Sequence, residues 1–475
     1  MAEILIGASL AVSGFGILAP VRRDVPGWAR VWLSFPIGAA VYLVVALSLI
    51  ILTGTLTPEV ALGLSAGLGV VGLVVAASTQ RPGLADVKWG AYAVGVAVVT
   101  VIVARGLHLT RLTPDSLRYL LAANDLALPE AFEQVHRADL LLRQIGLPSL
   151  HTLSELTDRR YMASIAPLFG VSGLGLFTWL SWRLTQGSEA RRRMWLVVGS
   201  VLFLGSTNRL VYDSFYINTH IQMAVFLLIA VAGSWLAVTT DKPGWAWPAG
   251  LALAATLLMR PEAPLVVAVV LVAVAASRAR WAVRWAMTLP SVVVMTLWYG
   301  IALWQHANFG NRIALTAPVF GSLVAVFSAT GVTIAGGWGR ARSVVKHFDL
   351  IAIAGLALLV AGYGARTPDV VVVSIKATFR NLTYDGMWML TWVAALGLLA
   401  VALLVQRVPD SRLWTVPILG FGLLYWLLPL LRDGAWRVGT GDSGNRILAH
   451  IIAVVVMFLV LAATNRRTEE SVLVP

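Results

Sequence analysis

Apolar runs separated by short polar segments follow one another along nearly the whole chain. A hydrocarbon core about 30 Å thick needs about 20 residues of α-helix, and about fifteen runs approach or reach that length. They cover 4–20, 33–53, 60–78, 89–107, 161–182, 194–207, 217–238, 245–259, 263–276, 286–304, 314–336, 349–363, 389–405, 413–430 and 447–463. The pattern predicts an all-α polytopic membrane protein with about 13–15 transmembrane helices.

Composition supports this fold class and narrows the chemistry. Of the 475 residues, 58% are hydrophobic and 12% are charged, whereas soluble domains carry about 25% charged residues. The absence of cysteine excludes disulfides, thiolate metal sites and cysteine nucleophiles. The net charge of +13 is interpreted as arginines in short loops that fix the orientation in the membrane lipid bilayer. No nucleic-acid partner is predicted.

The basic residues predict the orientation, because cytoplasmic loops of membrane proteins are enriched in lysine and arginine. Basic residues outside the runs gather after odd-numbered runs: Arg22, Arg23, Arg30, Arg81, Lys88, Arg183, Arg191, Arg192, Arg193, Arg278, Arg280, Arg284, Arg340, Arg342, Lys346, Arg407, Arg412, Arg466 and Arg467. The N-terminus is therefore predicted outside and the C-terminus inside, in the inner (plasma) membrane. The other segments, which carry most of the unusual polar residues, are predicted to be extracytoplasmic.

The longest extracytoplasmic segment, 108–160, is too long for a bare linker. Thr113 is a good helix N-cap and Pro114 suits the first helical position, so a helix is predicted to begin there. Asp115 then lies in the first turn beside the membrane. It is either a simple helix-terminal acid or a functional carboxylate. A second surface helix is predicted over Pro129–Ile145 from its apolar stripe.

Three further extracytoplasmic stretches carry candidate site residues. "NRLVYDSFYINTH" places Asp213, Tyr216 and His220 there, although tyrosines also form interfacial belts. "LLMRPEAPL" holds Arg260 and Glu262, which either pair with each other or leave Arg260 facing a cavity.

"LRDGAWRVGTGDSGNRILAH" holds the remaining candidates, Arg437, Arg446 and His450. Arg446 and His450 are four residues apart and share one helix face. Arginine offers paired donors that suit a phosphate. The alternative is that arginines at helix ends snorkel to the membrane surface.

Taken in order, these motifs resemble the GT-C superfamily of polytopic glycosyltransferases. The features are Asp115 with Arg118 and Tyr119, then "Pro167-Leu-Phe-Gly" leading to "Trp182-Arg-Leu", "Leu-Leu-Met-Arg260-Pro-Glu", and "Gly-Asn445-Arg446" followed by His450. The resemblance covers Trp89 to the end. It divides the chain into N-terminal helices, 1–88, and a catalytic module, 89–475. The acidic loop follows the fourth run here, whereas in the family it follows the first.

The resemblance implies a hexosyl or pentosyl transferase with an extracytoplasmic active site. The donor would be a sugar on a polyprenyl phosphate and the acceptor a glycan, lipid or protein. Asp115 would be the base, and Arg446, His450, Arg260 and Arg437 would bind the donor phosphate. Tyr119, Asp213, Tyr216 and His220 would bind the acceptor. Some such enzymes use a divalent metal, for which Asp115 and Asp213 are candidate ligands, and the metal requirement stays open.

Two other functions remain open. An O-antigen polymerase or ligase also uses lipid-linked sugars, and it would depend on arginines more than on Asp115. A secondary transporter would show inverted repeats and charges in the middle of the bilayer.

Overall fold

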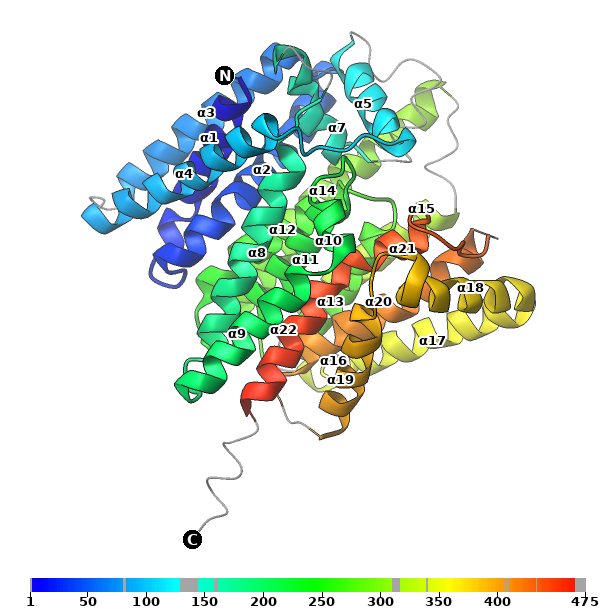
Figure 1. Ribbon diagram of the computed structural model, residues 1–475. Helices are drawn as coiled ribbons and strands as arrows, with labels where there is room; N and C mark the ends of the chain where they lie inside the picture. Colours follow the sequence, from blue (N-terminus) through cyan, green and yellow to red (C-terminus); the bar gives the residue numbers. More distant parts are fainter. Residues whose placement is uncertain are drawn as a thin grey trace.

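The computed structural model describes residues 2–79, 83–128, 144–157, 161–309, 317–338, 341–405, 408, 410–432 and 434–465. Within these ranges the chain is helical and forms no strand. An isolated backbone bridge joins Arg111 to Tyr216. The beginning of α1 and the end of α22 lie on opposite sides of the view in Figure 1, with α5 on the same side as the beginning of α1. We call these two sides the α5 end and the C-terminal end.

The N-terminal helices pack closely around one central helix. They are α1 (Ala2–Ile17), α2 (Gly27–Thr53), α3 (Pro58–Ser78) and α4 (Leu84–Gly106). α1 contacts the other three. At Gly14 of α1, an added Cβ would lie 1.9 Å from the carbonyl oxygen of Ser34 in α2, so only glycine permits this close approach. α4 also packs against α8 (Ile165–Leu184), which links this group to the rest of the protein.

The predicted surface helix at Thr113 is confirmed. α5 (Pro114–Ala127) begins directly after Thr113, whose N–H donates to Ser116 Oγ at 3.1 Å. A short helix, α7 (Gly146–His151), packs against α5. The second predicted surface helix, Pro129–Ile145, falls almost entirely on residues 129–143, which lie outside the described ranges.

α11 (His220–Thr239) is the central helix of the second half, and 94% of its most apolar 18-residue stretch is buried. It packs against α8, α12, α20 and α22. The helices of this half, besides α8 and α11, are α9 (Ala190–Gly205), α10 (Asn208–Asp213), α12 (Ala246–Leu257), α13 (Ala263–Ala276), α14 (Trp281–Phe309), α15 (Ala317–Ala335), α16 (Arg342–Val345), α17 (Phe348–Arg366), α18 (Pro368–Arg380), α19 (Thr391–Val405), α20 (Arg412–Leu431), α21 (Ser443–Ile447) and α22 (Ala449–Asn465).

Every predicted apolar run corresponds to a helix, and the fold class is confirmed as an all-α polytopic membrane protein. Among the described residues, 8 helices are long and apolar enough to cross a membrane: α2, α3, α4, α8, α11, α17, α20 and the segment Ser443–Thr464. α1, α13, α19 and part of α15 are shorter apolar helices. The count of 13–15 crossings stays a prediction.

Loops predicted on the same side of the membrane contact one another. Arg22 pairs with Asp86 at 2.9 Å, and Arg280 pairs with Asp241 at 2.5 Å. All four residues belong to predicted cytoplasmic segments. The predicted extracytoplasmic segments meet at the α5 end, as described below. The structure therefore separates the two sets of loops, while the membrane side that each set faces stays a prediction.

Candidate functional site

A short backbone pairing positions the beginning of α5 against the segment before α11. The Arg111 N–H donates to the Phe215 carbonyl at 2.7 Å, and the Ile217 N–H donates to the Arg111 carbonyl at 3.4 Å. The hydroxyls of Thr113 and Tyr216 then lie 2.7 Å apart. These contacts fix the first turn of α5, and with it Asp115, beside Tyr216.

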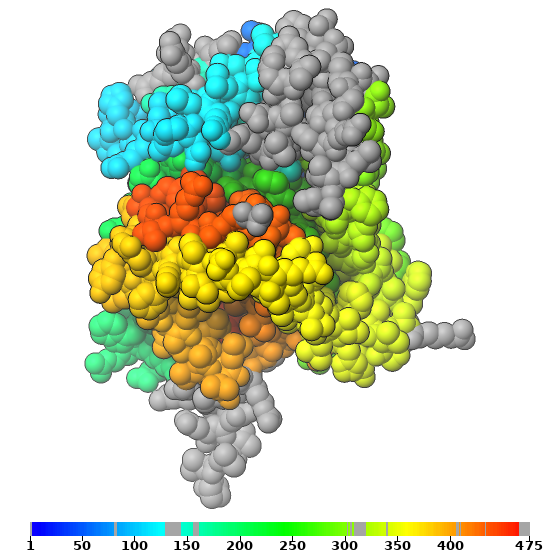
Figure 2. Space-filling model, turned by 90° about the vertical axis from the view of Figure 1, so that its right-hand side faces the viewer, coloured from blue at the N-terminus to red at the C-terminus, as the bar shows by residue number. Residues whose placement is uncertain are grey.

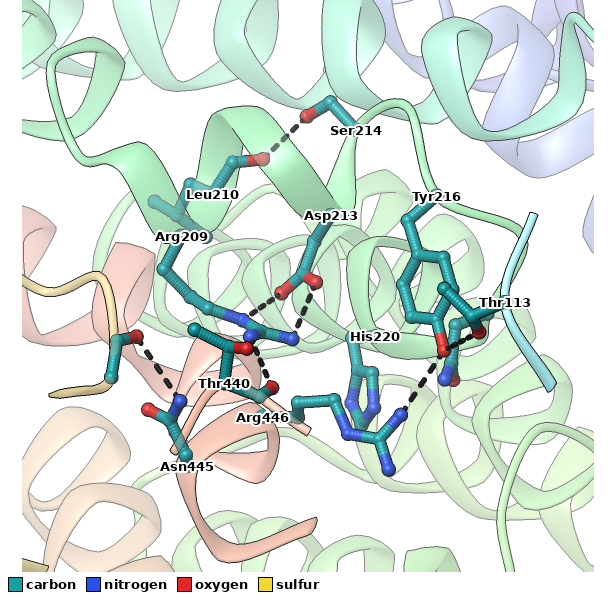
Figure 3. Close-up of polar contacts among 12 residues, drawn as sticks. Thr113, Arg209, Leu210, Asp213, Ser214, Tyr216, His220, Thr440, Asn445 and Arg446 are labelled. Carbon is teal, nitrogen blue, oxygen red and sulfur yellow. Dashed lines mark hydrogen bonds and ion pairs between the residues drawn. The ribbon is translucent and has the colours of Figure 1, made fainter. Parts of the chain in front are cut away.

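Asp115 contacts Arg446, which comes from the opposite end of the sequence. Arg446 Nη1 lies 2.5 Å from Asp115 Oδ2 and 3.2 Å from the Tyr216 hydroxyl (Figure 3 shows Arg446 and Tyr216). The Asp115 side chain is 36% exposed and that of Arg446 is 10% exposed. Arg446 Nε is buried and has no hydrogen-bond partner among the described residues. The pair therefore combines a carboxylate that solvent can reach with a guanidinium that keeps one donor unused.

Behind this pair lies a buried layer of two histidines and an arginine. His220 Nδ1 is 2.8 Å from His450 Nε2, and Arg260 Nη1 is 3.3 Å from His220 Nε2. Since arginine can only donate, a neutral His220 accepts at Nε2 and donates from Nδ1 to His450. His450 then carries its proton on Nδ1, a buried atom without a partner among the described residues.

Arg260 and Glu262 pair with each other, the first of the two alternatives weighed for this turn. Arg260 Nε lies 2.5 Å from Glu262 Oε1. Burial opposes ionisation of Glu262, but the Arg260 guanidinium outweighs it and holds the pKa of that carboxyl below its usual range. Burial likewise lowers the pKa of Arg260, yet Glu262 raises it further, with smaller contributions from Tyr119 and Asp115. Arg260 therefore lies within electrostatic reach of α5.

Asp213 is held by Arg209 rather than by the cluster around Asp115. Arg209 donates to both carboxylate oxygens, at 2.9 and 3.2 Å, and to the Thr440 carbonyl at 2.9 Å (Figure 3). Burial raises the pKa of Asp213 to about 6, against the opposing effect of the Arg209 charge. A substrate can reach the Asp213 carboxylate only if this pair separates, so these contacts do not favour its predicted role in acceptor binding.

Arg446 is fixed by the loop that precedes it. Asp442 caps α21 by accepting from the Gly444 N–H at 2.8 Å. The Asn445 side chain accepts from Trp388 Nε1 at 2.6 Å and donates to the Gly386 carbonyl at 3.1 Å. Figure 2 shows this orange-red segment at the surface, below the cyan α5. The side chain of Arg446 is thereby presented to α5 from a rigid support.

Arg437 lies apart from this cluster. It is exposed and lines a polar cleft of about 450 Å³ together with Arg432, Trp436 and Asp442. Its carbonyl accepts from the Asn381 side chain at 2.8 Å, so the backbone is held in place at this residue. The structure thus brings together all of the predicted phosphate-binding residues except Arg437.

An apolar groove runs directly beside the polar cluster. It has a cavity volume of about 240 Å³ and lies between α8, α9, α10 and α11. Residues of α10 alternate between the two environments: Leu210 and Val211 line the groove, while Arg209 and Asp213 face the polar side. Phe215 also lines the groove and precedes Tyr216. A ligand with a charged head and a long apolar chain would contact both the polar cluster and the apolar groove.

The two carboxylates considered as metal ligands do not meet. Asp115 is paired with Arg446 and Asp213 with Arg209. Among the described residues, no three His, Asp or Glu side chains are close enough together to hold a metal ion. The donor set observed around Asp115 does not fit a divalent ion as it stands.

Sequence reasoning did not identify two contacts at the α5 end. The Arg209–Asp213 pair has an i,i+4 spacing, a signal that could have identified it. The contact between His220 and His450 joins residues 230 positions apart, and no local pattern indicates it.

No protein-family model matches the chain, and no curated protein or solved structure is similar to it at a significant level. Functional conclusions therefore rest on the residues themselves.

Proposed function

We propose that the protein is a GT-C-like glycosyltransferase. It transfers a sugar from a polyprenyl-phosphate donor to an acceptor hydroxyl on the extracytoplasmic face. The observation that carries the proposal is the contact between Asp115 and Arg446 beside an apolar groove. This arrangement offers a base, an anion-binding group and a place for a lipid chain within one site.

The donor phosphate would bind at Arg446 and the layer behind it. Arg446 Nε and His450 Nδ1 are buried donor positions without partners among the described residues, and buried polar atoms in proteins are normally hydrogen-bonded. Arg260 adds a second guanidinium close by. A phosphate supplies the acceptor oxygens that these groups lack, and arginine binds it with paired donors.

The isoprenoid chain of the donor would occupy the groove formed by α8, α9, α10 and α11. This groove is lined almost entirely by apolar side chains and begins where the polar side of α10 ends. Apolar burial contributes about 25 cal/mol per Å² of surface, so a long chain bound there adds substantial affinity. The phosphate would then lie at the level of Tyr216.

In the proposed reaction Asp115 removes the proton of the acceptor hydroxyl while its oxygen attacks the anomeric carbon of the donor sugar. The bond between that carbon and the phosphate oxygen breaks, and polyprenyl phosphate leaves with the electron pair. Arg446 stabilises the charge that develops on the departing phosphate. A positioned base of this kind contributes about 10²–10⁴-fold to the rate.

The contact between Asp115 and Arg446 also implies an order of events. A phosphate that binds Arg446 competes with the Asp115 carboxylate for the same guanidinium. Donor binding would therefore release Asp115, and the base would become available once the donor is in place. Tyr119, in the same helix as Asp115, and Tyr216, which contacts Arg446, are the proposed acceptor contacts.

The sidedness of the site is part of the proposal. With 13–15 crossings in the plasma membrane and the N-terminus outside, the α5 end faces the extracytoplasmic space, where polyprenyl-linked sugars are presented. A reporter fused at Ala127, the last residue of α5, would give an extracytoplasmic signal. A cytoplasmic signal there would contradict the orientation.

The test of activity is sugar transfer by the purified protein from polyprenyl-phosphate sugars. Wild type should transfer, Asp115→Asn should lose at least about 100-fold, and Asp125→Asn, a matched change in the same helix, should stay near wild type. Absence of transfer from every donor class would overturn the proposal. Transfer that survives Asp115→Asn but is abolished by Arg446→Ala would favour the polymerase or ligase alternative.

A further inference from the structure

A second apolar groove lies near the C-terminal end, remote from Asp115. α9 and α19 both pack against α22, and the groove lies between them with a cavity volume of about 410 Å³. The walls include Gly199 and Ser200 of α9 and Ala402 of α19, and the floor includes Val456 and Val460 of α22. Because these wall side chains are small, they leave the space between the two helices unfilled.

The length of the groove matches one leaflet of a bilayer. It extends along α9 from Arg192 to Phe203, which at 1.5 Å per residue is about 16 Å. That is about half of a hydrocarbon core about 30 Å thick. An added Cβ at Gly199 would have no neighbour within 4 Å, so the groove is open at its middle. Its dimensions suit an acyl chain that enters from one leaflet.

One basic residue lines the mouth of the groove, and a second is its neighbour in the sequence. Arg192 is half-buried there, and its guanidinium donates to the Ala463 carbonyl near the end of α22. Arg191 beside it is exposed, as is Glu189, the residue before α9. Trp195 lines the groove and is 63% exposed. Tryptophan is enriched at the headgroup level of membranes, which places the mouth at the interface.

We propose that this groove binds one anionic phospholipid, with an acyl chain between α9 and α19 and its phosphate against Arg191 and Arg192. The lipid belongs to the leaflet at the C-terminal end, which the basic residues predict to be cytoplasmic. Anionic lipids of that leaflet attract basic side chains at the membrane surface. The site is separate from the Asp115 cluster, so it stands independently of the proposed glycosyltransferase activity.

The test is a titration of phosphatidylglycerol and of phosphatidylcholine into the full chain in neutral detergent, with bound lipid counted by native mass spectrometry. Two variants probe the site. Arg192→Gln removes the charge at the mouth, and Gly199→Leu fills the open middle of the groove. Two matched controls lie elsewhere: Arg183→Gln removes a charge from the last turn of α8, and Gly95→Leu adds a side chain on α4, where the added Cβ also meets nothing within 4 Å.

Wild type should retain one phosphatidylglycerol more tightly than phosphatidylcholine. Arg192→Gln should weaken that binding about fivefold, and Gly199→Leu should abolish it, while both controls should bind as wild type does. Equal retention of the two lipids by wild type would overturn the proposal, as would undiminished binding by Gly199→Leu. Gly199→Leu keeps the test valid if Arg192→Gln folds poorly, because leucine is a better helix former than glycine.

Discussion

Two arginine–carboxylate pairs at the α5 end have the same chemistry and different surroundings. Arg209 and Asp213 are separated by one helical turn, and their side chains are 0% and 1% exposed. Asp115 and Arg446 come from distant parts of the chain, and the carboxylate of that pair is 36% exposed. Arg209 also donates to the Thr440 carbonyl, whereas Arg446 Nε has no partner among the described residues.

This difference separates a structural pair from the pair that is proposed to take part in the reaction. Breaking a buried pair leaves an uncompensated charge in a medium of low dielectric constant, which is strongly destabilising. A pair with a partly exposed carboxylate contributes less to stability, because water can solvate that carboxylate when the pair separates. The buried pair therefore holds α10 against the loop before α21, while the open pair can exchange its partner for a ligand.

The largest effect is expected where the buried pair is broken. Arg209→Met should lower the free energy of unfolding by about 3–5 kcal/mol, because Asp213 remains buried without its partner. The apparent melting temperature in detergent measures this. Arg446→Met is the matched change in the open pair and should lower stability much less. Equal losses in the two variants would remove the distinction between the pairs.

A smaller effect on the free energy of unfolding is expected from the protonation of a buried histidine at the same end. His151 is buried, which lowers its pKa to about 3, and its Nδ1 accepts from the Met162 N–H at 3.2 Å. In the unfolded chain His151 takes up a proton near pH 6.5. The contribution of the neutral ring to the free energy of unfolding is therefore fully present above that pH and is lost as pH falls towards 3. Between pH 7 and 5 the loss is about 2 kcal/mol.

Removal of the titratable ring should therefore flatten the pH dependence. His151→Asn should lose less stability than wild type between pH 7 and 5, measured as the shift in melting temperature. His108→Asn replaces an exposed histidine and should follow the wild-type profile. A His151→Asn profile parallel to that of wild type would show that the buried ring does not control acid sensitivity.

A change of less than about 1 kcal/mol is expected when the open pair loses its carboxylate. Asp115→Asn removes a partly exposed ion pair, and such pairs are typically worth about 0–1 kcal/mol. The melting temperature should therefore stay close to that of wild type even though transfer is lost. A large drop in stability would assign Asp115 to the structural class with Asp213.

The smallest effect is expected at Arg437. Its side chain is exposed in the separate polar cleft, so Arg437→Gln should change transfer by less than about threefold, as for other exposed charges. The matched change Arg446→Gln should reduce transfer far more, and the ratio of the two rates is the quantity to measure. A loss at Arg437 equal to that at Arg446 would restore its predicted role in phosphate binding.

Much of the arrangement follows from local sequence. The apolar runs predicted the helices, because a helix buried in lipid must satisfy its own backbone. Thr113 and Pro114 predicted the beginning of α5 through capping chemistry. The alternation of basic loops placed Asp115, Arg446 and His450 on one side, and the structure brings Asp115 and Arg446 into contact and places His450 in the layer behind.

Other features depend on tertiary packing that local patterns do not encode. The stacking of His220 on His450 results from α11 packing against α22. α12 has only 12 residues, about 18 Å, because its burial in the protein allows a helix shorter than a full crossing. The i,i+4 spacing could have identified Arg209 as the partner of Asp213. Nothing in the local sequence indicated that the pair is buried.

The most direct test measures donor affinity and transfer rate together in Asp115→Asn. Removing the carboxylate frees Arg446, so the variant should bind a polyprenyl phosphate more tightly than wild type while transferring sugar at least about 100-fold more slowly. Wild-type transfer by this variant, or weaker binding of the lipid phosphate, would contradict the assignment of Asp115 as the base that competes for Arg446.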